Sequence, residues 1–452
     1  MPRPRTAQGN IFASEGGTGH LSRMLRTSEE GFEAAFEALL GAKREDSPEV
    51  DEAVAAIIAD VRARGDAALV ELTARFDRLD VAGTLRVTED EIDEAMRAAP
   101  AEEVEALRLA AERIRAYHER QVPPDESWQD AAGATLGWRW TPVDAAGLYV
   151  PGGLASYPSS VLMNAVPAKV AGVGRLAMVT PMPDGAVNPL VLAAARIAGV
   201  DEVWRIGGAQ AVAALAYGTE SIAPVDKITG PGNAFVAAAK RRVFGKVGID
   251  SIAGPSEVLV IADADNDPDW VAVDLLSQAE HDASAQAILI TDDEGFGEAV
   301  TAAVANRLET LERRNIAGPS WRDFGAVIAC RDMAEAADLA NRLAPEHLEL
   351  LVDDPDALAA RIRHAGAIFL GRWTPEAIGD YVAGPNHVLP TSRTARFSSG
   401  LSVLDFLKRT TLTRMTPEAL KAAGPAAETL ARSESLEAHA LSVALRLEQL
   451  NR

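Results

Sequence analysis

The chain has 452 residues, which is long enough for two or more domains with substantial cores. Its hydrophobic content of 48% is that of an ordinary globular protein. Asp and Glu outnumber Lys and Arg by 66 to 44, and the net charge of −22 argues against nucleic acid and anionic membrane surfaces as partners. The single cysteine, Cys330, excludes a disulfide framework and is expected to be a buried core thiol.

The N-terminal part of the chain changes character at about residue 28. Residues 1–27 contain Gly and Arg with little hydrophobic pattern, which predicts an extended arm. Arg3 and Arg5 precede no continuous apolar stretch, and no run of about 18 apolar residues occurs, so we expect no secretion, no membrane segment and a cytoplasmic location. From residue 28 to about residue 122, apolar residues recur at three- and four-residue spacing, which predicts a helical N-terminal block.

Short apolar segments then alternate with amphipathic ones, and the same rhythm restarts after Gly254-Pro255. Alternation of this kind predicts two α/β domains with parallel sheets covered by helices on both faces. Residues 416–452 are again helical in pattern and predict a C-terminal arm that packs on another subunit. The predicted strands are 145–150, 175–180, 202–206, 258–262, 287–291, 348–352 and 367–370, and the predicted helices include 161–173, 188–197, 270–280 and 355–364.

Histidines in polar segments suggest a metal site beside an acid–base pair. Gln278 and His281 are three apart on a predicted helix, and Asp380 and His439 would add a carboxylate and a second imidazole, which together suit zinc. Glu346-His347 could supply acid–base chemistry. Each motif taken alone has a simpler interpretation as a solvated helix face, a helix cap or a surface histidine, so spacing does not decide between them.

A series of sequence blocks, in the order of a known enzyme family, favours a functional site over these simpler interpretations. From about residue 30 to the C-terminus, the chain closely resembles the histidinol dehydrogenase family, block after block in unbroken order. The blocks that carry this resemblance are Tyr149-Val-Pro-Gly-Gly153, Tyr157-Pro-Ser-Ser-Val161, Gly230-Pro-Gly-Asn233, Ala253-Gly-Pro-Ser-Glu257, Leu276-Ser-Gln-Ala-Glu-His281, Ala344-Pro-Glu-His347, Gly379-Asp380 and Gly384-Pro-Asn-His-Val-Leu-Pro390.

The resemblance implies oxidation of L-histidinol to L-histidine in two NAD-dependent steps, the last reactions of histidine biosynthesis. It implies His347 as the base and Glu346 as the residue that activates water. The implied zinc ligands, which also hold the substrate, are Gln278, His281, Asp380 and His439, with Ser256 and Glu434 as further substrate contacts. The resemblance also implies an intertwined homodimer, in which Glu434 and His439 of the C-terminal arm come from the partner subunit.

The nucleotide site also depends on the resemblance. The chain contains no G-x-G-x-x-G fingerprint, so dinucleotide binding would not be predicted from glycine spacing. The resemblance implies two incomplete Rossmann-type domains, with Tyr149, Gln210 and Asn233 in contact with NAD. The predicted domains are residues 28–124 with 257–398, the nucleotide-binding domain 125–256, and an arm from 399 to 452.

Some alternatives stay open at the level of sequence. His387 lies in a matching block, and a structural hydrogen-bonding role is as compatible with its position as a direct one. A related zinc- and NAD-dependent dehydrogenase could act on another small diol, such as a sulfonated propanediol, although an acidic residue at Glu434 disfavours an anionic substrate. A non-catalytic metal-binding protein of the same fold would have less reason to keep both Glu346 and His347.

Overall fold

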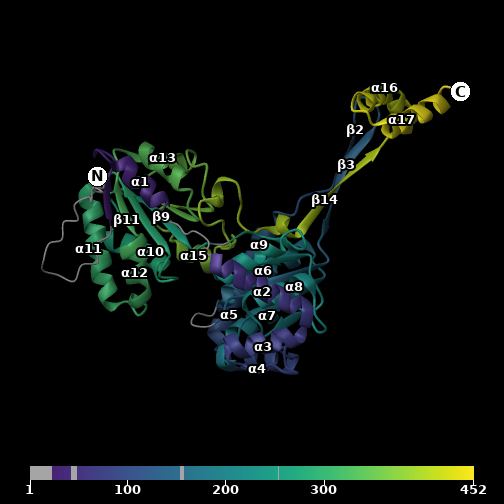
Figure 1. Ribbon diagram of the computed structural model, residues 1–452. Helices are drawn as coiled ribbons and strands as arrows, with labels where there is room; N and C mark the ends of the chain where they lie inside the picture. The colour runs from purple at the N-terminus through teal and green to yellow at the C-terminus, as the bar shows by residue number, and fades with distance from the viewer. Residues whose placement is uncertain (1–22, 42–47, 153–156, 253) are drawn as a thin grey trace, which may run out of the picture. The chain divides into compact units, whose positions relative to one another are not determined.

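The structure, a computed structural model, describes residues 23–41, 48–152, 157–252 and 254–452. Its internal contacts divide the chain into two compact units. Unit 1 draws on residues 1–44, 255–377 and 391–397, and unit 2 on residues 45–254, 378–390 and 398–452. Each unit is built on a parallel sheet with helices on both faces, which confirms the predicted fold class (Figure 1).

The sheet of unit 1 has six parallel strands. Strand β9 (Glu257–Ala262) is buried along its whole length. Chain order reverses beside this strand, because the next two strands lie on one side of it and the following two on the other. In spatial order the strands are β1 (Arg23–Arg26), β11 (Ala326–Ala329), β10 (Gln286–Thr291), β9 (Glu257–Ala262), β12 (His347–Leu351) and β13 (Ala367–Leu370).

Two hydrophobic cores cover the faces of this sheet. Alternate side chains of β9 enter different cores, with Leu259 and Ile261 on one face and Val258 and Val260 on the other, as the pleat requires. The first face packs against α1 (Phe32–Gly41), α13 (Met333–Leu343) and α14 (Pro355–Ala359). The second packs against α10 (Pro268–Ala279), α11 (Glu294–Thr310) and α12 (Arg314–Phe324) (Figure 1).

Unit 2 repeats the arrangement with a five-stranded parallel sheet. Its order is β6 (Glu202–Trp204), β5 (Arg175–Val179), β4 (Ala145–Tyr149), β7 (Lys227–Thr229) and β8 (Gly248–Ile249), so chain order reverses between β4 and β7. One face packs against α4 (Glu89–Ala98), α5 (Ala101–Glu119), α6 (Pro158–Ala171) and α7 (Pro189–Ala198). The other packs against α2 (Pro48–Arg64), α3 (Asp66–Asp77), α8 (Gly208–Tyr217) and α9 (Ala234–Val243).

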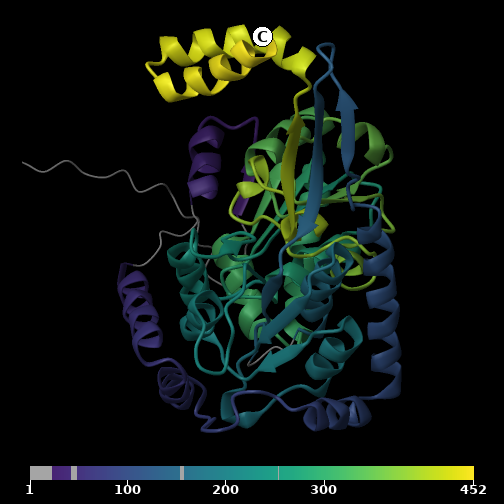
Figure 2. The ribbon, with the colours of Figure 1, turned by 90° about the vertical axis from the view of Figure 1, so that its right-hand side faces the viewer.

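A three-stranded antiparallel sheet and a helix pair complete unit 2. The strands are β14 (Leu407–Arg414), β3 (Thr135–Pro142) and β2 (Glu126–Gln129), which lie side by side in Figure 2. They precede α16 (Pro417–Ser433) and α17 (Glu437–Leu450). The two helices approach closely at Gly424, where an added Cβ would lie 3.0 Å from Leu447. Short 3₁₀ turns occur at η1 (Pro183–Gly185), η2 (Thr394–Arg396) and η3 (Val403–Phe406).

Several local predictions were wrong. The arm predicted for residues 1–27 includes 23–26, which form β1 and pair in parallel with β11, whereas residues 1–22 lie outside the described residues. The helix predicted over 355–364 ends at Ala359. The antiparallel sheet was not predicted, because β2 is exposed at every position and therefore has no hydrophobic alternation.

The division of the chain also differs from the predicted one. Residues 28–124 were assigned to the first α/β domain, but α2 to α5 pack in unit 2. The reason is the apolar stripe of α2, where Val54, Ile58 and Val61 enter the same core as α8 and α9. Residues 399–452, predicted as a separate arm, also group with unit 2.

Two smaller expectations concern burial. Cys330 is buried, as predicted, and burial raises the pKa of its thiol to about 12, so it stays protonated at neutral pH. Within the described ranges, no helix has both the length and the apolar character that a bilayer crossing requires.

Candidate active site

The predicted acid–base pair lies where α13 leads into β12. Helix α13 ends at Ala344, which adopts a left-handed conformation with φ of 44°, and Pro345 and Glu346 then lead into the strand. His347 is the first residue of β12 and pairs in register with Val258 of β9. Both Glu346 and His347 are buried, with 5% and 4% of their surfaces exposed, at the amino edge of the unit 1 sheet.

The backbone of Glu257 holds both members of the pair. Its N–H donates to Oε2 of Glu346 at 2.9 Å, and its carbonyl oxygen lies 3.1 Å from Nδ1 of His347. Because a carbonyl oxygen can only accept, Nδ1 of His347 must carry the proton in this contact. The neutral imidazole then has its lone pair on Nε2, which is the tautomer that a general base needs.

A second carboxylate, Glu376, completes this arrangement and was not predicted from the sequence. Glu376 is the first residue of α15 (Glu376–Tyr381), a helix that crosses the division between the units, and it is 2% exposed. Its Oε1 lies 3.3 Å from Nδ1 of His347. A buried carboxylate at this nitrogen orients the imidazole and stabilises its protonated form. The available signal was its position four residues before Asp380, on the same helix.

The buried carboxyl group of Glu349 supports the start of α15, and Asp274 interacts with Glu349. Oε1 of Glu349, a fully buried residue of β12, accepts the backbone N–H of Glu376 at 2.5 Å. Burial and the neighbouring Asp274 raise the pKa of Glu349 well above its ordinary value, and burial raises the pKa of Asp274 to about 6. The pair is therefore expected to retain a proton near neutral pH, which lets one carboxyl donate to the other.

The predicted metal ligands of unit 1 lie at the end of α10. Gln278 is in the last turn of this helix and is fully buried, yet neither its Oε1 nor its Nε2 has a hydrogen-bond partner among the residues that the structure describes. A buried amide without a partner costs free energy, so its environment suits a ligand. His281 is exposed and lies beyond the helix end, so the prediction that it shares a helix with Gln278 was wrong.

Ser256, the predicted substrate contact, directly precedes β9 and is half-buried. Its carbonyl oxygen accepts the backbone N–H of Gln286, the first residue of β10. Parallel strands place their amino ends at one edge, and a helix between them returns its C-terminal end to that edge. The unit 1 fold therefore assembles Ser256, Gln278, Glu346 and His347 along one side of the sheet.

Asp380 belongs to unit 2, where it contacts His387. Nδ1 of His387 lies 3.1 Å from the carbonyl oxygen of Asp380, and its Nε2 lies 3.4 Å from Oγ of Ser160, the third residue of α6. The neighbouring Asn386 donates to the carbonyl oxygen of Met163 in the same helix at 2.6 Å. These contacts show His387 as a hydrogen-bonding residue that ties the segment after α15 to α6.

The predicted NAD contacts lie at the carboxyl edge of the unit 2 sheet. Tyr149 ends β4, and Asn233 stands between β7 and α9, so both lie beside the position where strand order reverses. In open α/β sheets, ligands usually bind outside the carboxyl ends of the strands at the position where strand order reverses. Gln210 lies in the first turn of α8, which follows β6, and is 2% exposed.

Tyr149 and Asn233 are each fixed by backbone contacts. The Tyr149 hydroxyl accepts the N–H of Gly208 at 3.0 Å, and burial raises the pKa of Tyr149 to about 12, so the hydroxyl keeps its own proton for donation. Asn233 is exposed and caps α9, because its Oδ1 accepts the N–H groups of Phe235 and Val236 at 3.1 and 3.2 Å.

Glu434 and His439 lie on the C-terminal helix pair. Glu434 is the C-cap of α16, and His439 is in the first turn of α17. Both side chains are exposed in this chain. Exposure is what a residue would show if its contacts were made with another subunit.

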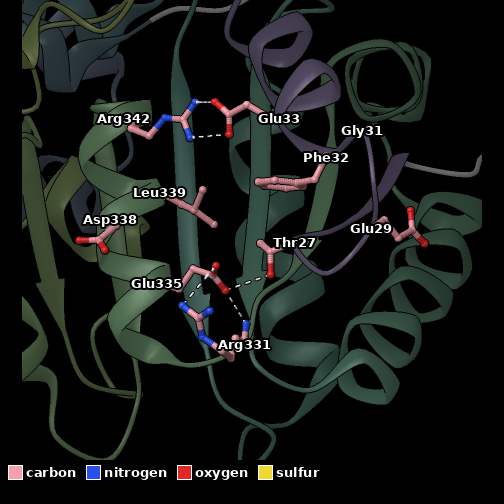
Figure 3. Close-up of a pocket in the computed structure, with 10 residues that line it drawn as sticks. All are labelled: Thr27, Glu29, Gly31, Phe32, Glu33, Arg331, Glu335, Asp338, Leu339 and Arg342. Atoms are coloured by element: carbon pink, nitrogen blue, oxygen red, sulfur yellow. Dashed lines mark hydrogen bonds and ion pairs between the residues drawn. The ribbon is translucent and has the colours of Figure 1, made fainter.

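A separate pocket of about 450 Å³ opens in unit 1 after β1 and β11 (Figure 3). Four of its charged residues form ion pairs, Arg342 with Glu33 and Arg331 with Glu335. Glu335 also accepts the hydroxyl of Thr27 at 2.9 Å. None of the predicted site residues lines it. This pocket is therefore separate from the predicted site residues.

The comparisons with known proteins identify the family. A family model described as histidinol dehydrogenase matches residues 41–447. The chain is 74% identical to the histidinol dehydrogenase of Ruegeria pomeroyi over 432 residues, which cover 95% of this chain and 100% of that protein. It is 66% identical to that of Rhodospirillum rubrum over 94% of this chain and 98% of that protein. The crystal structure of histidinol dehydrogenase from Elizabethkingia anophelis matches with a TM-score of 0.92 and 35% identity, covering 97% of this chain and 100% of that one.

The structure is that of an α/β protein with two parallel sheets, a reversal of strand order in each unit and a buried Glu–His pair in unit 1. The sequence match extends over nearly the whole length of both chains. The chain therefore belongs to the histidinol dehydrogenase family, which confirms the resemblance seen in the sequence.

Proposed function

We propose that this protein oxidises L-histidinol to L-histidine in two NAD-dependent steps, as a zinc-containing cytoplasmic enzyme of histidine biosynthesis. The observation that carries the proposal is that the backbone of Glu257 forms hydrogen bonds with both Glu346 and His347. A pair fixed in this way by one residue keeps its geometry while a substrate changes through two oxidations.

His347 is the base in this proposal. Its Nδ1–H is directed at the Glu257 carbonyl with Glu376 at 3.3 Å, so Nε2 is the nitrogen that takes the proton of the substrate hydroxyl. The same nitrogen takes the proton of the aldehyde hydrate in the second step. Glu346 takes a proton from the water that adds to the aldehyde, and its carboxylate is held for this by the Glu257 N–H.

NAD, when bound, supplies the hydride acceptor for both oxidations. Tyr149, Gln210 and Asn233 are the residues that we assign to it, because they gather at the carboxyl edge of the unit 2 sheet. Tyr149 offers a protonated hydroxyl, Asn233 an exposed amide and Gln210 a buried one.

We assign Gln278, His281, Asp380 and His439 as zinc ligands. The donor set fits, since it offers two imidazoles, a carboxylate and an amide oxygen, and the buried amide of Gln278 has no other partner within the part of the chain that the structure describes. Zinc, when bound, orients the imidazole and amine of histidinol. Ser256 and the carboxylate of Glu434 contact the substrate as well, and a carboxylate suits its ammonium group.

Because Glu434 and His439 are exposed in the single chain, we propose that they reach the site of a partner in a homodimer. The helix pair that carries them also exposes leucines that a single chain leaves in water, a liability that a partner surface would remove. These leucines are Leu430, Leu436, Leu441 and Leu445, with 63%, 42%, 41% and 59% of their surfaces exposed.

The direct test is NADH formation with L-histidinol, with a sulfonated propanediol as the control substrate. We expect turnover of histidinol alone, because Glu434 would repel an anionic group. Removal of the metal by chelation should abolish turnover, and added zinc should restore it. His281→Asn should weaken zinc binding by about tenfold or more, whereas His364→Asn, at a histidine outside the site, should leave zinc content unchanged. Full activity in protein shown to be free of metal would contradict the proposal.

A further inference from the structure

A buried ion pair in unit 2 holds the loop that carries Asn233. Lys240 lies on α9 and is 2% exposed, and Asp250, directly after β8, has a side chain that is 5% exposed. The Lys240 ammonium contacts the Asp250 carboxylate. A lysine is rarely buried to this extent, so the pair calls for an explanation.

The two charged groups form hydrogen bonds with the backbone carbonyl and the backbone N–H of the same residue, Gly230. Nζ of Lys240 donates to the carbonyl oxygen of Gly230 at 3.1 Å, and Oδ2 of Asp250 accepts the N–H of Gly230 at 2.8 Å. Asp250 is itself held by its backbone N–H, which donates to the carbonyl oxygen of Ile228 in β7 at 3.2 Å. Both hydrogen-bonding groups of Gly230 are therefore satisfied by a single charge pair.

Gly230 is placed where only glycine fits. Its φ is +112°, and an added Cβ would lie 2.1 Å from the carbonyl oxygen of Tyr149. The Lys240–Asp250 pair, called the clamp below, thus holds the start of the loop 230–233 beside Tyr149 at the end of β4. The other end of the same loop is Asn233, the cap of α9.

Stability alone does not account for a buried pair of this kind. Taking two charges out of water costs several kcal/mol per ion, and hydrophobic substitutes of similar volume are often equally stable. A directional pair does supply fixed geometry that an apolar pair lacks. Here the fixed element is the loop between Tyr149 and Asn233.

We propose that Lys240 and Asp250 are positioning residues for the NAD site, which they shape by clamping Gly230 so that Tyr149 and Asn233 keep their relative placement. The inference rests on the proposed function, because it takes these two residues as NAD contacts. Neither charged side chain needs to touch the cofactor.

The test compares the wild-type enzyme with the double variant Lys240→Met/Asp250→Asn, which removes both charges and leaves neither one buried alone. We expect the dissociation constant for NADH, measured by calorimetry, and the KM for NAD to rise by about tenfold or more, the loss expected when one or two loop hydrogen bonds are misplaced. The KM for histidinol and the zinc content should not change. Lys169→Met, which breaks the more exposed Lys169–Asp201 pair of the same unit, is the matched control and should bind NADH normally.

Asp250→Asn alone is the second variant, and it decides the matter if the double variant does not fold. Its Oδ1 can still accept from Gly230 but its charge is gone, so we expect a severalfold loss of NADH affinity. If the folded variants bind NADH as the wild type does, the clamp is not a positioning device. If KM rises equally for NAD and histidinol, the pair is only structural. If the wild type itself binds no NADH, the proposed function fails instead.

Discussion

Replacing His347 with Asn should lower kcat for histidinol by about 10²–10⁴-fold, the usual cost of losing a general base. Asn can still donate an N–H toward the Glu257 carbonyl, but it has no basic nitrogen in place of Nε2. Both oxidations should slow, because each removes a proton from a hydroxyl group. Steady-state rates with histidinol and with histidinaldehyde measure the two steps, and His364→Asn serves as the matched control.

Glu346→Gln separates the second role from the first. Gln keeps an oxygen to accept the Glu257 N–H, so the local geometry should survive. Only the conversion of aldehyde consumes water, so this variant should be slow with histidinaldehyde and form aldehyde from histidinol at close to the normal rate. Equal slowing in both half-reactions would show that Glu346 does not act mainly on water.

Two inactive variants should restore activity in each other if the site is shared between subunits. A His347→Asn chain and a His439→Asn chain each give a dead homodimer. After subunit exchange, a mixed dimer has one site with both lesions and one with neither. Random pairing makes about half of the dimers mixed, so roughly a quarter of wild-type activity is the expected ceiling.

Mass spectrometry must show that exchange has occurred. Activity is measured as histidine formed, because Glu346→Gln is expected to retain the first oxidation. A mixture of His347→Asn with Glu346→Gln is then the matched control, because both of these residues lie in unit 1 of the same chain and each mixed dimer has a lesion in both sites. If mixed dimers form in the first mixture and no activity returns, His439 acts within its own chain.

The sequence predicted the central strands well because strands that are buried on both faces appear as short, continuous runs of apolar residues. Residues 258–262 of β9 and 287–290 of β10 are all apolar, and the structure buries each of them. Strand β14 contains no such run, since seven of its eight residues, Lys408 to Arg414, are exposed. Its pairing with β3 depends on contacts across the chain, which hydrophobic periodicity does not encode.

The site followed the same rule. Glu346 and His347 are adjacent in the chain and fall within a recognisable block, so the sequence predicted them as a pair. Glu376 and the backbone of Glu257 reach His347 only through strand pairing and the placement of α15, and they became visible only in the structure. The Lys240–Asp250 pair was missed for a similar reason, because nothing local predicts that a lysine on a helix will be buried.

The stoichiometry of the reaction tests the central claim most directly. If one base at one site serves both oxidations, as we propose, each molecule of histidinol consumed should yield two NADH and one histidine, with little aldehyde in solution. NADH absorbance and chromatography of the amino acid, followed in the same reaction, give this ratio. A yield of one NADH with histidinaldehyde released to solvent would contradict the account.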